Sequence, residues 1–158
     1  MQTFKDKNGT LWHIELNVGT AKKVKADCGV DLIEIISVDN NVETTVFEKL
    51  SRDVGLLVDV LFSLCSIEAK ERGVDAEAFA GLFIGETIET STDALINEII
   101  NFSPPIRRKM LTRVWEMSSD LMGKMEKDAE ALLKSPEFEQ ELKSQFSSLY
   151  TSMPGSAE

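Results

Sequence analysis

The chain has few of the residues from which catalytic and metal sites are usually built. It contains a single histidine, His13, and two cysteines, Cys28 and Cys65, which lie in apolar surroundings without the short spacing of a zinc site. Serine-type triads, cysteine–histidine pairs and histidine-rich metal centres would all depend on that one histidine. We therefore predict no catalytic residue, no metal site and no cofactor. Two separated cysteines also favour a reducing compartment, the cytoplasm, over a disulfide framework.

Motifs that bind phosphate or activate a nucleophile are missing as well. The sequence has no GxGxxG, GxxxxGK[ST], GxSxG or HExxH. The segment 6–9 opens like a calcium-binding EF-hand loop, but its glycine comes two positions early and Asn17 replaces the closing glutamate. A turn is the better interpretation. One group of acidic residues lies at the start of a predicted helix: Glu86, Glu89 and Asp93. We expect these residues to form a solvated face, where the helix dipole favours negative charge. An enzyme that uses their carboxylates is a formal alternative.

Basic residues are scarce relative to acidic ones. The 17 Lys and Arg against 27 Asp and Glu give a formal charge of -10. This is the wrong sign for a general nucleic-acid binder, which needs a cationic face to displace counterions. The longest nearly uncharged apolar run, residues 54–67, is too short to cross a bilayer, and the first ten residues lack the apolar stretch of an export signal. We expect neither nucleic acid nor a membrane as a partner.

The first eighteen residues predict a β-hairpin. Apolar side chains alternate with polar ones and fall on one side: Phe4, Trp12, Ile14, Leu16 and Val18. Residues 6–9 supply a tight turn between the two runs. Because an isolated hairpin is only marginally stable in water, its apolar face must pack on something else.

The rest of the chain predicts helices. Caps and apolar spacing place them at about 20–28, 42–52, 54–72, 75–83, 87–102, 105–135 and 136–149, with 54–72 surrounded by other elements. Branched residues in 30–38 favour a third strand that completes a small sheet, with one helical turn as the alternative. The predicted fold is mainly α (α+β), with an N-terminal β-hairpin or small antiparallel sheet packed on a bundle of about five to six helices and a long C-terminal helix.

We predict a single domain over residues 1–150. It comprises a hairpin or small sheet plus a short helix (1–38), central helices (42–103), and the long helix with the C-terminal helix (105–150). Residues 151–158 have nothing to bury and are predicted to be a disordered tail.

Residues 105–150 carry the feature most typical of a protein-binding surface. Four of the six methionines fall within sixteen residues of one amphipathic helix, and their unbranched side chains can repack against differing apolar surfaces. The predicted partner-binding residues are Met110, Val114, Met117, Leu121, Met122, Met125, Phe138, Leu142 and Phe146. Two alternatives stay open. In the first, the methionines form a core with the 54–72 helix. In the second, part of this row of apolar side chains is buried and part is exposed.

One basic cluster lies at the start of the long predicted helix, where cations are electrostatically disfavoured. Its members are Arg107, Arg108, Lys109 and Arg113. An acidic partner or a neighbouring subunit could offset this cost, and so could the chain's own carboxylates.

Several landmarks follow one another in a characteristic order. They are Trp12-x-Ile14, the run Val24–Gly29 leading into Val30-Asp31-Leu32, Asp59–Cys65, Arg72–Asp75 with Phe79, Gly85–Glu89, and Thr92–Leu95. Over residues 3–103 this order resembles a family of small proteins encoded in phage and prophage tail modules. The long helix and the tail match that family only in character.

The resemblance implies a tail assembly chaperone of siphophage-like particles. Such a protein is small, mainly helical and acidic, coats the tape measure protein before the tail tube polymerises, and is absent from the finished virion. We accordingly expect a non-enzymatic protein of the host-cell cytoplasm that binds the tape measure protein and self-associates weakly. The alternative is a structural tail or connector subunit that stays in the virion and forms rings through its hairpin edges.

Overall fold

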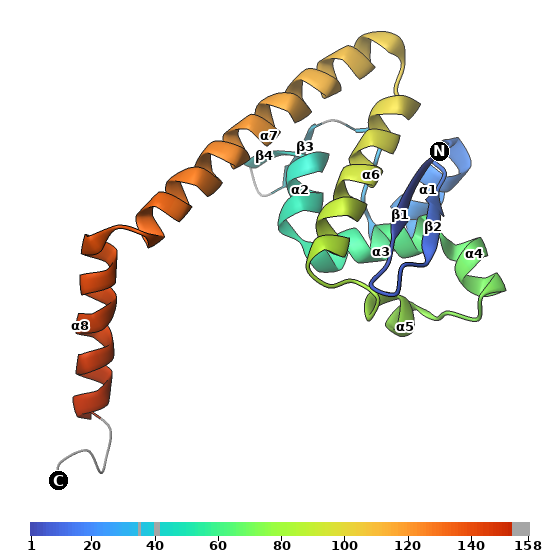
Figure 1. Cartoon of the computed structure of the whole chain (residues 1–158). Coiled ribbons are helices and arrows are strands. Elements are labelled where there is room, and N and C mark those ends of the chain that lie inside the picture. Colours follow the sequence, from blue (N-terminus) through green and yellow to red (C-terminus); the bar gives the residue numbers. More distant parts are fainter. Residues whose placement is uncertain (35, 40–41, 153–158) are drawn as a thin grey trace. The chain divides into compact units, whose positions relative to one another are not determined.

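The computed structural model of the chain describes residues 1–34, 36–39 and 42–152 (Figure 1). These residues form eight helices and four strands, so the protein is mainly α, as predicted. The contacts group into two units, Met1–Arg113 and Val114–Glu158, and each is described by itself. Grouping by contacts does not test whether the segments fold together, so the single domain over 1–150 stays a prediction.

The N-terminal hairpin forms as the alternating pattern predicts. Strand β1 (Gln2–Lys5) pairs antiparallel with β2 (Leu11–Ile14), and Phe4 lies opposite Trp12. The apolar side chains of the hairpin and of the residues just after it are buried, with the exception of Val18, which begins the next helix and is 55% exposed. The buried ones are Phe4, Trp12, Ile14 and Leu16.

Helix α1 (Val18–Cys28) begins two residues earlier than predicted because Asn17 caps it. The Asn17 side chain accepts from the backbone N–H of Thr20, and the Thr20 hydroxyl accepts from the N–H of Asn17, which is a capping box. Gly29 ends the helix in the left-handed conformation, with φ 71°, where a glycine carries no steric penalty.

The predicted third strand of the first sheet is wrong. Strand β3 (Ile36–Asp39) pairs antiparallel with β4 (Val42–Thr45) in a separate two-stranded sheet. Pairing with an immediate neighbour closes a much shorter loop than pairing with the N-terminal hairpin, and therefore costs less chain entropy. The helix predicted from residue 42 instead begins at Val46, because Thr45 and Glu48 form its capping box. The predicted turn at 39–41 lies mostly outside the described residues.

The helix predicted over 54–72 is divided into two. Helix α3 (Val54–Leu64) ends at Cys65, whose ψ of 9° departs from helical geometry, and α4 (Ser66–Glu71) follows in a new direction. This division gives eight helices in the described residues, one more than the seven predicted ranges. Helix α3, which is the first half of the predicted 54–72 helix, contacts α1, α2, α5 and α6. This half is therefore surrounded by other elements, as its apolar composition predicts.

The remaining helices of the first unit lie within or close to the predicted ranges. They are α2 (Val46–Arg52), α5 (Ala76–Ala80) and α6 (Glu86–Phe102). Helix α5 ends three residues before the predicted Phe83, although the Phe83 side chain is still buried. Ser103 and two prolines end α6, as expected.

An aromatic cluster joins the hairpin to the helices. The Phe79 ring lies 5.0 Å from the Trp12 ring in an edge-to-face arrangement, and 5.3 and 5.1 Å from Phe62 and Phe83. Phe83 in turn lies 5.5 Å from Phe4 of β1. Such pairs contribute about 0.5–1.5 kcal/mol each beyond burial. The segment around α5 therefore connects the hairpin to α3, and α6 packs against β1 and β2.

The C-terminal part of the chain consists of α7 (Pro105–Leu133) and α8 (Pro136–Ser152), drawn in orange and red in Figure 1. The Ser135 hydroxyl accepts from the N–H of Phe138 and so caps α8. The disordered tail predicted from residue 151 is wrong for Thr151 and Ser152, which belong to α8, and the Thr151 hydroxyl donates to backbone carbonyls one turn earlier. The tail prediction for residues 153–158 lies outside the described residues.

The hairpin turn depends on the carboxylate of Asp6, which is 6% exposed. Its oxygens accept from the N–H groups of Asn8 and Thr10 at 2.8 and 3.0 Å and from Trp12 Nε1 at 2.9 Å. Burial on its own would raise the pKa of Asp6, but the hydrogen bonds from Trp12 and from the turn outweigh it and hold the pKa below its usual value. The folded state therefore favours the ionised carboxylate.

We predict that Asp6→Ala lowers the free energy of unfolding at pH 7 by about 2 kcal/mol, because three donors lose their acceptor. The folded pKa is lowered, so this stabilisation is present above the ordinary pKa of 3.8 and is lost as the pH falls through the lowered value. Urea unfolding of both proteins from pH 7 to pH 2.5 measures the difference, which should shrink below about pH 4. Asp93→Ala, on the exposed side of α6, is the control, and an equal loss in it would contradict the role of Asp6.

Candidate functional site

The predicted partner-binding residues form an exposed apolar face on α7 and α8. The exposed fractions of Met110, Met117, Met122 and Met125 lie between 57% and 64%, far from those of core residues. Leu121 and Phe146 are exposed to a similar degree, Val114 and Leu142 less so, and Phe138 is half-buried. This exposure favours a surface face over the alternative of a methionine core. We call these nine residues the apolar face; partner binding by it stays a prediction.

Two depressions lie along the apolar face in the second unit. One, of about 490 Å³, follows α7, and its lining includes Val114, Met117 and Leu121 together with Asp120 and Lys124. The other, of about 660 Å³, lies where α7 gives way to α8. Its lining includes Leu133, Phe138, Leu142, Phe146 and, at the rim, Glu139 and Lys143. Apolar floors with charged rims fit the apolar side chains of another protein better than they fit a small polar substrate.

The helical pattern also identified residues that do not belong to the face. Leu111 is 2% exposed and therefore part of the core of the first unit, although it lies one position from Met110. Conversely, the exposed apolar surface extends beyond the predicted set to Leu132, Leu133, Leu149 and Tyr150. Leu132 and Leu149 continue the same three- and four-residue steps, so the sequence contained the signal for them.

Two arginines of the basic cluster at the start of α7 bind backbone carbonyls, some of them at the end of α6. Arg108 Nη2 donates to the carbonyls of Asn101 and Ser103 at 2.8 and 3.3 Å, where α6 ends with unpaired acceptors. Arg107 Nη1 donates to the carbonyl of Ile33 at 3.0 Å. These two arginines thus bind backbone carbonyls, an arrangement that was not among the alternatives left open by the sequence.

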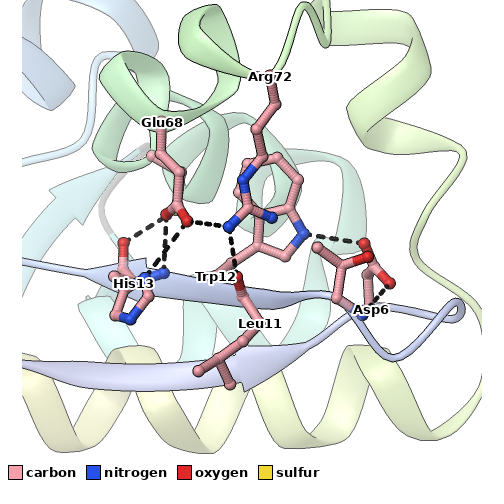
Figure 2. Close-up of polar contacts among 8 residues, drawn as sticks. Asp6, Leu11, Trp12, His13, Glu68 and Arg72 are labelled. Atoms are coloured by element: carbon pink, nitrogen blue, oxygen red, sulfur yellow. Dashed lines mark hydrogen bonds and ion pairs between the residues drawn. The ribbon is translucent and has the colours of Figure 1, made fainter.

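The single histidine belongs to a polar cluster that covers one edge of the hairpin (Figure 2). Glu68 of α4 accepts from the backbone N–H of His13 at 3.0 Å, and its other oxygen lies 3.3 Å from His13 Nδ1. Arg72 pairs with Glu68, donates to the carbonyl of Leu11 at 2.9 Å, and places its guanidinium 4.6 Å from the centre of the Trp12 ring. Both carboxylate oxygens of Glu68 and the carbonyl of Leu11 have partners, so the cluster holds β2 in place.

The two thiols are poor nucleophiles at neutral pH. Burial raises the pKa of Cys65 to about 12, and its Sγ lies 3.4 Å from the carbonyl of His13. Burial and the nearby carboxylate of Asp59 also raise the pKa of Cys28. Since the thiolate is the reactive form, neither residue is suited to covalent catalysis.

Metal and membrane sites receive no support from the described part of the chain. No group of three or more His, Cys, Asp or Glu side chains within it could hold a metal ion. None of the helices described is both long enough and apolar enough to span a bilayer. The carboxylates of Glu86, Glu89 and Asp93 are exposed along the first turns of α6, where negative charge is favoured by the helix dipole.

We predict that iodoacetamide at pH 8 modifies Cys28 before Cys65 in the folded protein, because Cys65 is both buried and shifted to the higher pKa. Mass spectrometry of tryptic peptides over time measures the two rates. In urea the two thiols should react at similar rates, which serves as the control. Modification of Cys65 as fast as Cys28 without urea would contradict its burial.

We predict that Met117→Gln changes the free energy of unfolding by less than about 0.5 kcal/mol, because the side chain is already in water. Leu111→Ala, on the same helix, should cost about 2–5 kcal/mol, because it leaves a cavity in the core. Urea unfolding of both variants measures the contrast. Similar losses in the two variants would mean that the methionines belong to a core.

Comparisons of the chain with models of protein families, with characterised proteins and with solved structures found no match. The fold and the apolar face therefore rest on the sequence and on the geometry described above, and the resemblance to phage-tail proteins stays a hypothesis.

Proposed function

We propose that the protein is a non-enzymatic assembly chaperone that binds a helical segment of a client protein through the apolar face of α7 and α8. One observation carries this proposal, the row of large apolar side chains that α7 and α8 expose at helical spacing. Extended apolar surface of this kind is costly for a soluble protein to maintain and usually marks an interaction site.

The spacing of the apolar face suits a helix as the bound element. Side chains such as Val114, Met117 and Leu121 follow one another at three and four residues, which is the repeat that an amphipathic helix presents in return. Flexible methionines tolerate clients whose apolar side chains vary from turn to turn. A long helical client with many such turns could therefore bind several copies in succession.

The charge around the apolar face favours a basic client. Residues 114–152 contain eight Asp or Glu and four Lys, a net charge of -4, within a chain of charge -10. Complementary charge speeds encounter and disfavours wrong partners more than it adds affinity. The same acidic charge makes self-association through this face weak, which keeps it available.

The more specific part of the proposal, a tail assembly chaperone whose client is the tape measure protein, is supported by the resemblance over residues 3–103. A chaperone of this kind works in the cytoplasm of the infected cell, requires no cofactor, and leaves before the tail is complete. Reversible apolar docking supports that behaviour, because release requires no bond to be broken.

We predict that coexpression with the tape measure protein of the same tail module increases the soluble fraction of that protein several-fold. A triple variant, M117Q/L121Q/M125Q, should lose most of this effect, because it removes apolar anchors without changing charge. The matched control is S119Q/K127Q/E130Q, on the opposite side of α7, which should behave like the unmodified chain. Gel densitometry of soluble and pelleted client measures the effect.

A client that is equally soluble with and without this protein would contradict the chaperone function. The alternative, a structural tail or connector subunit, makes the opposite prediction for the particle. Mass spectrometry of purified virions should not find the chain if it is a chaperone, and should find it in stoichiometric amounts if it is a structural subunit.

A further inference from the structure

The methionines of the apolar face expose their sulfur atoms to solvent. The exposed fractions of Met110, Met117, Met122 and Met125 lie between 57% and 64%. All four belong to α7 and fall within sixteen residues (Figure 1). Leucine would supply a similar apolar contact and volume, whereas methionine adds a thioether that an oxidant can reach. The surface that we propose for client binding therefore also concentrates one kind of chemical reactivity.

The two cysteines, which are the usual first targets of a peroxide, are shielded. A peroxide reacts with the thiolate, so a thiol with a raised pKa reacts slowly. Cys65 is 2% exposed, and burial raises its pKa to about 12. Burial also raises the pKa of Cys28, which is only partly exposed. Oxidation of the thiols is thereby slowed in the folded protein, which leaves the exposed thioethers as targets.

We propose that the four methionines are a modification site, where oxidation to methionine sulfoxide by hydrogen peroxide switches off client binding. This inference rests on the proposed function of the apolar face. The thioether sulfur attacks one oxygen of the peroxide, so that the S–O bond forms as the O–O bond breaks. The second oxygen leaves as hydroxide and becomes water by taking the proton of the new S–OH group. Sulfur loses two electrons, and the peroxide gains them.

The sulfoxide changes the surface at positions that the client has to cover. Met117 lines the depression along α7 together with Val114 and Leu121. An apolar client side chain offers no hydrogen bond to a sulfoxide oxygen, and burial of a polar group without a partner is unfavourable. In the unbound chain the same oxygen lies in water, because the Met117 side chain is 59% exposed. Oxidation therefore weakens binding without destabilising the fold.

The modification is also reversible. A methionine sulfoxide reductase removes the oxygen as water, oxidises two thiols to a disulfide, and regenerates the thioether. Dithiothreitol alone reduces disulfides but leaves sulfoxides unchanged. Recovery that requires the reductase thus identifies methionine as the oxidised residue.

The test uses the purified full chain and, as the client probe, the tape measure protein of the same tail module diluted from urea. Light scattering measures how much of the chain suppresses aggregation of this probe. After treatment with hydrogen peroxide and its removal by catalase, at least about fivefold more of the chain should be needed. Both methionine sulfoxide reductases with dithiothreitol should restore the original requirement, and dithiothreitol alone should not. Peptide mass spectrometry identifies the oxidised residues.

The matched control is M110L/M117L/M122L/M125L, which preserves the apolar face and removes its four sulfur atoms. It should suppress aggregation within about twofold of the unmodified chain, both before and after peroxide. The two other methionines and both cysteines remain in it, so an effect of their oxidation would still be seen. The comparison of reductase with dithiothreitol alone decides the question should this variant fail to fold.

Two results would contradict the switch and leave the chaperone function intact. One is equal suppression of aggregation by the oxidised and untreated chains. The other is equal sensitivity of the leucine variant and the unmodified chain to peroxide, because the effect would then arise outside the apolar face. Unfolding of the oxidised chain in circular dichroism would also overturn the proposal, since loss of the fold would explain the loss of binding. An untreated chain that suppresses no aggregation would instead contradict the chaperone function, and the switch with it.

Discussion

The first unit depends on how Trp12 is held. A two-stranded hairpin has too little buried surface to be stable alone, so something must fix it to the helices. Trp12 does this on three sides, since its Nε1 donates to Asp6, its ring packs edge-to-face on Phe79, and the Arg72 guanidinium covers it from the remaining side. One side chain thereby connects the hairpin turn, the aromatic cluster and α4. Trp12 is the largest fully buried side chain among the described residues, and its one polar group is satisfied.

The break at Cys65 determines what α4 can do. An uninterrupted helix over 54–72 would continue along the axis of α3, whereas the observed break turns α4 so that Glu68 and Arg72 reach the backbone of β2. Two side chains one helical turn apart then supply an acceptor and a donor to alternate residues of a strand, which imitates a neighbouring strand. Closure of the outer edge of β2 follows directly from this arrangement.

The sequence predicts local structure well and long-range structure poorly, for reasons that particular residues illustrate. Alternation around Trp12 and the caps at Asp53 and Asp75 act within a few residues, and the hairpin and the starts of α3 and α5 form as predicted. The strand at 36–39 and the break at Cys65 are determined by partners that periodicity does not encode. The apolar face was predictable as a set of residues at helical spacing, but spacing does not distinguish Leu111, which is buried, from Met110, which is exposed. The closure of the outer edge of β2 was not predictable, because it depends on the side chains of Glu68 and Arg72, more than fifty residues away in the sequence.

The proposed function of the apolar face has a consequence for the kind of client that it would take. Binding by this face would come mainly from burial of apolar area, which salt affects little. A client helix would meet this requirement without help from the backbone of α7 or α8, because a helix satisfies its own backbone hydrogen bonds. An extended segment would leave its N–H and carbonyl groups without partners against an apolar surface. The apolar face would therefore favour a client segment that is already helical.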